Sequence, residues 1–236
     1  MMRLDKYLAD MGMGTRSEIK EKIKKGQIRV NEEIIKKPET KVEPFTDKIS
    51  VQGKTVSYIT YEYYMLNKPS GYVSATTDKK YPTVLDLISD KKRKDLFPVG
   101  RLDIDTEGLL LITNDGALSH QLLSPKKHVK KTYFAKIEGH VTKEDVLKFK
   151  EGLAIGEEKL TLPAELEILK SDAVSEIKVT IVEGKFHQIK RMFEAVDKKV
   201  LFLKRLSMGS LILDEKLALG EYRPLTEQEI RGLKGN

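Results

Sequence analysis

Three carboxylates stand at alternate positions in one short stretch of this sequence, at Asp103, Asp105 and Glu107. They follow Arg101 closely and lead into an apolar run at residues 109–112. Carboxylates at this spacing can bind a cation, close a turn or react with a substrate directly, and each role requires different neighbours. The surrounding residues therefore decide between these three roles.

The cluster matches only the first half of a calcium-binding loop. The three carboxylates and the following Gly108 take positions 1, 3, 5 and 6 of that loop. Position 12 requires a bidentate Glu but is Asn114 here, and position 9 is the apolar Leu111. Because an apolar strand cannot also wrap around a cation, the sequence argues against a calcium site.

Other familiar cofactor and catalytic motifs are absent from the sequence. The histidines His120, His128, His140 and His187 show no zinc-ligand spacing such as HExxH. The sequence contains no GxxxxGK[ST] phosphate loop, no GxGxxG fingerprint and no nucleophile elbow. A two-metal nuclease stays open at this point, because acidic residues are plentiful.

The remaining interpretation is a carboxylate that acts alone, at a loop that enters a buried strand. Asp103 fits this role, with Arg101 or another cation keeping it ionised. An ionised carboxylate on a rigid support is what attack at the anomeric carbon of a sugar requires. Asp105 and Glu107, which precede Gly108, are more typical of turn residues.

The composition excludes several classes of protein. The chain has 236 residues, no cysteine and a net charge of +7, and no apolar run approaches the roughly 20 residues that cross a bilayer. Asp5 and Asp10 interrupt the amino terminus, where a secretory signal needs an apolar core. We expect a cytoplasmic protein, most simply a monomer.

The second half of the chain contains two basic segments, residues 124–136 and 185–205. The first has five lysines and no acid, and the second is basic overall. Either one alone is typical of a solvated face, but together they favour a track for phosphates. The candidate contacts are Lys126, Lys127, Lys130, Lys131 and Arg191.

The hydrophobic pattern divides the chain into two domains, 1–58 and 59–236. In the first, apolar residues at helical spacing precede a capping box at 15–18, and a hairpin is predicted around Gln52-Gly53. In the second, the predicted strands are 61–66, 109–113, 132–137, 165–169 and 176–182, and the predicted helices begin near 82, 142, 186 and 226. Since helices do not alternate regularly with strands, the fold class is α+β with a mixed or antiparallel sheet.

The first domain resembles the S4 RNA-binding domain. The resemblance rests on RLDKYLA at 3–9, TRSE at 15–18 and GQIRVN at 26–31. It implies a small αβ module whose second helix and following loop bind structured RNA. The implied contacts are Arg16, Lys20, Lys24 and Arg29.

The second domain resembles the rRNA pseudouridine synthases, in the group that often carries an S4 domain. GRLD at 100–103 with DTEGLL at 105–110 looks like the family signature. Further family-like segments follow elsewhere: MLNKPSGY at 65–72, KTY at 131–133, EGKFHQIKRM at 183–192 and GEYRPL at 220–225. These separate segments span almost the whole chain.

This resemblance implies the isomerisation of uridine to pseudouridine in RNA, with no metal or other cofactor. It makes Asp103 the catalytic carboxylate, Tyr133 the tyrosine that packs on uracil, and Lys190 the cation that pairs with the carboxylate. Arg101 is implied to fill the gap that the extruded base leaves, and Arg191 to contact a phosphate. Whether Asp103 attacks the sugar or abstracts a proton stays open.

Residues 80–88 and 186–192 look more like the small-subunit branch of this family. That branch implies 16S rRNA in an assembling subunit as the partner, with uridine 516 as the expected target. The alternatives are a large-subunit enzyme and a non-catalytic RNA-binding or ribosome-assembly protein.

Overall fold

The computed structural model describes residues 1–235, which divide into two compact units. Unit 1 contains Met1–Glu62 together with Ser89–Leu96, and unit 2 contains Tyr63–Ile88 and the chain from Phe97 onward. The segment Ser89–Leu96, which the sequence pattern assigns to the second domain, therefore packs with the first. Its buried Arg93 donates to Asp95 at 2.9 and 2.6 Å.

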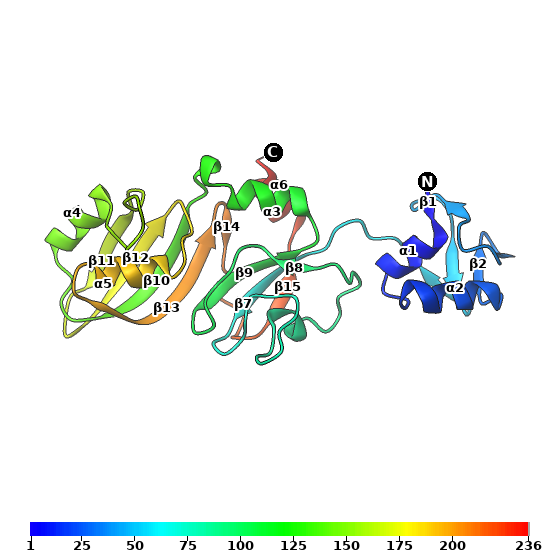
Figure 1. Ribbon diagram of the computed structural model, residues 1–236, viewed down its shortest axis with the longest axis horizontal. Helices are drawn as coiled ribbons and strands as arrows, with labels where there is room; N and C mark the ends of the chain where they lie inside the picture. Colours follow the sequence, from blue (N-terminus) through cyan, green and yellow to red (C-terminus); the bar gives the residue numbers. More distant parts are fainter. Residues whose placement is uncertain (236) are drawn as a thin grey trace. The chain divides into compact units, whose positions relative to one another are not determined.

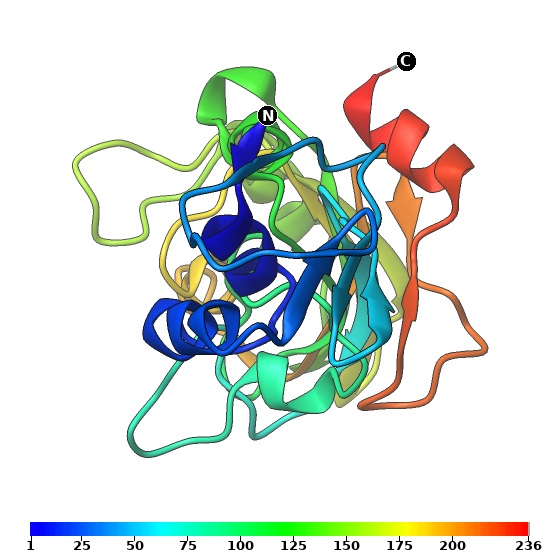
Figure 2. The same ribbon diagram turned by 90° about the vertical axis from the view of Figure 1, so that its right-hand side faces the viewer.

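Unit 1 packs two helices on one side of short strands, as Figure 2 shows in blue and cyan. The helices are α1 (Leu4–Asp10) and α2 (Arg16–Lys24). A four-stranded sheet has the order β3 (Glu33–Ile34), β2 (Ile28–Val30), β5 (Ile49–Val51), β6 (Lys54–Val56), and β1 (Met2–Arg3) pairs with β4 (Lys41–Val42).

Local signals set these elements. Thr15 and Glu18 form the predicted capping box, because each side chain accepts the other residue's backbone N–H. The predicted hairpin is also present, with Gln52 and Gly53 at its turn. The apolar residues at helical spacing are buried in the core of this unit: Leu4, Tyr7, Leu8 and Met11.

Unit 2 is built on one mixed nine-stranded sheet (Figure 1). Seven strands follow the order β11 (Glu165–Lys170), β12 (Val174–Ile181), β10 (Lys131–Glu138), β13 (Lys199–Met208), β9 (Glu107–Thr113), β7 (Tyr63–Lys68), β15 (Tyr222–Pro224). In addition, β14 (Leu211–Ile212) pairs with β13, and β8 (Phe97–Pro98) pairs with β9. Only the β9–β13 pair among these is parallel, which confirms the predicted α+β fold with a mixed sheet.

The helices of unit 2 are η1 (Val84–Leu87), α3 (Gly116–Leu123), η2 (Pro125–Lys127), α4 (Lys143–Glu151), α5 (Gln188–Glu194) and α6 (Glu227–Lys234). Four of them lie where the sequence predicts, and Thr142 and Thr226 cap α4 and α6. Neither α3 nor β13 is among the elements predicted from the sequence. Asp115, which follows the predicted strand 109–113 closely, is the N-cap of α3 and accepts from Leu118 N–H at 3.0 Å.

The central strands β9 and β13 meet over only two residue pairs, Glu107 with Lys204 and Gly108 with Arg205. Gly108 has a φ of +96°, and a Cβ there would overlap the carbonyl oxygen of Arg205. Only glycine therefore permits this close approach of the two strands. Where the strands separate, the buried Arg205 side chain donates from Nε to the carbonyl of Leu109 at 2.7 Å.

Replacing Gly108 with Ala should destabilise unit 2, because the new methyl group forces β9 and β13 apart and φ is strained. We expect the free energy of unfolding to fall by roughly 2–4 kcal/mol, measured by urea denaturation. Gly116→Ala is the control, because its Cβ meets no atom within 4 Å. Equal stability of the two variants would contradict this account of the β9–β13 contact.

Candidate active site

Asp103 lies on the loop between β8 and β9, and backbone hydrogen bonds fix this loop. Thr106 N–H donates to the carbonyl of Asp103 at 3.1 Å and closes a turn. Leu102 N–H donates to Ser74 Oγ at 3.0 Å, and that hydroxyl donates back to the Leu102 carbonyl. The loop is therefore a fixed support for the Asp103 side chain.

Lys68, the last residue of β7, holds the same loop through its backbone. Its buried ammonium donates to the carbonyls of Pro69, Ile104 and Thr106 at 3.0, 3.2 and 2.8 Å. A charged lysine has three N–H donors, so all three are used. Burial lowers the pKa of Lys68 to about 8, against the opposing effect of the nearby carboxylates. Lys68 has no role among the sequence predictions, although it lies in the family-like segment 65–72.

Lys190, near the start of α5, joins two of the three carboxylates. Its Nζ lies 3.1 Å from Asp103 Oδ2 and 2.7 and 2.9 Å from the two oxygens of Asp105. Burial acts to lower the pKa of Lys190, but the hydrogen bonds to both carboxylates outweigh it and raise that pKa. Burial likewise acts to raise the pKa of Asp105, and Lys190 reverses this and lowers it. The ammonium thus offsets the repulsion between two neighbouring carboxylates.

The cation beside Asp103 is therefore Lys190, while Arg101 is exposed and lines the adjacent cleft. Asp105 lies in the turn, as expected, but its carboxylate also binds Lys190. Glu107 is the first residue of β9 rather than a turn residue. The three carboxylates consequently have three different environments.

A cleft of about 90 Å³ opens beside Asp103. Tyr133 of β10 reaches it, and this side chain is only 7% exposed. The cleft is also lined by Arg101, Thr106, His187, Lys190 and Leu203. The structure therefore brings Asp103, Tyr133, Lys190 and Arg101 to one cleft, from three separate parts of the chain.

His187 is a cleft residue that is not among the sites predicted from the sequence. Its Nε2 lies 3.5 Å from Asp103 Oδ1, and its ring stacks on that of Phe186. Its place in the family-like segment 183–192 is the signal that could have identified it.

The proposed RNA contacts lie in both units. On α2, Arg16, Lys20 and Lys24 are exposed, and Arg29 on β2 is exposed and donates to the Glu32 carbonyl at 2.9 Å. In unit 2, Lys126 and Lys127 are exposed in η2, and the exposed Lys130 pairs with Glu165 at 2.8 Å. These side chains are accessible, as a phosphate contact requires.

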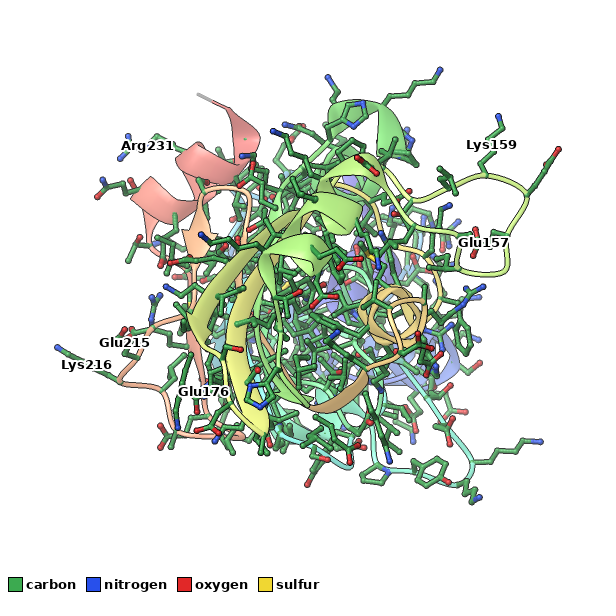
Figure 3. All side chains as sticks on the ribbon, turned by 90° about the vertical axis from the view of Figure 1, so that its left-hand side faces the viewer. Glu157, Lys159, Glu176, Glu215, Lys216 and Arg231 are labelled. Carbon is green, nitrogen blue, oxygen red and sulfur yellow. The ribbon has the colours of Figure 1, made fainter. Side chains whose placement is uncertain are left out.

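Two further predicted RNA contacts have partners within the protein. Lys131 is 7% exposed and donates to the carbonyl of Val129, and burial lowers its pKa. Arg191 donates to Glu157 at 3.0 Å and to the carbonyls of Phe186 and Ile155. Glu157 lies on the loop between α4 and β11 (Figure 3). Lys131 and Arg191 therefore bind groups of the protein itself, and their roles as phosphate contacts stay a prediction.

Within residues 1–235, no three His, Cys, Asp or Glu side chains converge as a metal site needs. No helix in this part of the chain combines the length and apolar character needed to cross a bilayer.

Residues 62–195 match the family described as RNA pseudouridylate synthase, and residues 2–56 match the S4 domain. The chain belongs to the RNA pseudouridylate synthase family. It is 47% identical over 231 residues to "Uncharacterized RNA pseudouridine synthase YtzG" of Bacillus subtilis, with 97% of each chain covered. It is 40% identical over 230 residues to "Ribosomal small subunit pseudouridine synthase A" of Escherichia coli, covering 97% of this chain and 98% of the other.

A solved structure described as a pseudouridylate synthase shares 39% identity with this family member, with a TM-score of 0.70. The similarity covers 99% of this chain and 100% of the other. The resemblance seen in the sequence, the fold and the assignment as an RNA pseudouridine synthase are thereby confirmed.

Lys68→Met should reveal the low pKa of this buried lysine. Between about pH 8 and 10.5 the unfolded chain binds a proton at this side chain that the folded chain does not, so stability rises with pH. We expect wild type to gain roughly 2 kcal/mol over Lys68→Met between about pH 7 and 9.5. Urea unfolding of both proteins at both pH values measures this, and a constant difference would contradict it.

Proposed function

We propose that this chain isomerises a uridine of small-subunit rRNA to pseudouridine, with Asp103 as the reacting carboxylate. The supporting observation is the pairing of Asp103 with Lys190 beside a cleft that also holds Tyr133. A carboxylate, a cation and a buried aromatic ring thus line a space that an extruded pyrimidine could enter.

In this proposal, the bond between ribose C1′ and uracil N1 breaks, and a bond between C1′ and uracil C5 forms. The proton on C5 leaves, and N1 gains one, so the product is an isomer of the substrate. Asp103 assists at the sugar or at the departing proton, and Tyr133 packs against uracil. Lys190 holds Asp103 in place, and Arg101, exposed at the cleft, occupies the gap in the RNA stack.

The proposed substrate is 16S rRNA in an assembling small subunit, and the proposed target is uridine 516. The name of the Escherichia coli relative, a ribosomal small subunit pseudouridine synthase, supports this choice. Mapping pseudouridine in total rRNA with and without the protein tests the target directly. A modification confined to large-subunit rRNA would exclude it.

Asp103→Asn should lower the rate of pseudouridine formation by roughly 10³-fold or more, because the carboxylate is lost without a change in shape. RNA affinity should stay within about threefold, because phosphate contacts dominate binding. The measurements are single-turnover pseudouridine formation and filter binding on the same RNA.

Asp105→Asn is the matched control, because it removes the other carboxylate that binds Lys190. We expect a smaller loss of rate than for Asp103→Asn. A normal rate in Asp103→Asn would exclude Asp103 as the reacting group, and strand cleavage that EDTA abolishes would point to a nuclease instead.

The exposed cations of α2 should contribute to the salt dependence of RNA binding. Replacing Arg16, Lys20 and Lys24 with Gln should reduce the slope of log K against log salt by roughly 2. The control replaces the exposed Lys36, Lys37 and Lys41, which lie in the same unit outside α2. An equal change in both variants would mean that α2 has no particular role in binding.

A further inference from the structure

Phe186 is a large apolar side chain at the surface, 73% exposed, and its neighbours Lys185 and His187 line the active-site cleft. One face of its ring stacks on His187, with 3.8 Å between ring centroids and 18° between planes. Such high exposure leaves the other face open to solvent. Exposed aromatic faces are the platforms on which proteins stack unpaired bases.

The segment that carries these rings is fixed, although the rings are exposed. Lys185 N–H donates to Gln188 Oε1 at 2.9 Å, and Arg191 Nη1 donates to the carbonyl of Phe186 at 3.1 Å. His187 Nε2 lies 3.5 Å from Asp103 Oδ1. The two stacked rings therefore keep a defined position beside the reacting carboxylate.

The cations around these rings already have partners in the protein. Lys185 and Arg191 pair with Glu157 at 3.3 and 3.0 Å, and Lys190 pairs with Asp103 and Asp105. The surface at this point therefore offers an aromatic face more than a free charge, which suits a base better than a phosphate.

We propose that the stacked rings of Phe186 and His187 form a ledge for the base next to the target uridine. This inference rests on the proposed function, in which the ribose of the target lies at Asp103. Extruding the target exposes one face of each of the two neighbouring bases, so Arg101 and the ledge can each cover one of them. The ledge begins at His187, beside Asp103, so a neighbouring nucleotide can reach it.

A double-mutant cycle between Phe186 and the RNA tests the ledge. All proteins carry Asp103→Asn so that the RNA is not converted, and the probe is a fragment of small-subunit rRNA containing the mapped uridine. Phe186→Ala should weaken equilibrium binding about tenfold on intact RNA. Two further RNAs lack the base before or the base after the target. On one of these two RNAs, the loss caused by Phe186→Ala should shrink to less than about twofold. Phe186→Trp should bind at least as tightly as the protein that carries Asp103→Asn alone.

Phe45→Ala is the control, because Phe45 is also highly exposed, at 77%, but lies in unit 1. Its effect on binding should be the same with and without the neighbouring bases. Equal weakening by Phe186→Ala on all three RNAs would overturn the ledge, as would no weakening at all. These outcomes concern binding only, so they are distinct from a failure to form pseudouridine.

Discussion

The close approach of β9 and β13 at Gly108 is the constraint on which the candidate active site depends. The loop that carries Asp103 ends where β9 meets β13. On its other edge β13 pairs with β10, where Tyr133 lies opposite Arg205. Helix α5, which carries Lys190, directly precedes β13 along the chain. The position of β13 therefore fixes Asp103, Tyr133 and Lys190 relative to one another.

Local signals in the sequence predicted much of the fold, whereas the prediction of the site depended on the resemblance to the family. Caps such as Thr15 and Thr142 act within one turn and can be recognised directly. The contact between Lys190 and Asp105 joins residues 85 positions apart, which no local pattern indicates. The family signature supplied the pairing of Lys190 with Asp103, and the fold shows the contact.

The departures from prediction also have physical causes. Lys131 belongs to a strand whose alternate residues Tyr133, Ala135 and Ile137 face inward, so strand periodicity could have shown that it is buried. Arg191 directly follows Lys190, and successive residues on a helix point in different directions, so the two side chains reach different partners. The pair Asp115-Gly116 is compatible with a turn and with a helix start. The burial of one face of α3 in the core favours the helix.

The two lysines of the site, Lys68 and Lys190, have different roles because their environments differ. Lys68 is buried against carbonyl oxygens, so it fixes the loop and has no access to a substrate. Lys190 offsets two carboxylates that would otherwise repel the phosphates of an approaching RNA. Its shortest contact is to Asp105 at 2.7 Å rather than to Asp103 at 3.1 Å. In the proposed reaction, in which a sugar engages Asp103, Lys190 would therefore keep a partner in Asp105. The carboxylate of Asp105 would thus hold the Lys190 ammonium in place and leave Asp103 free for the proposed role.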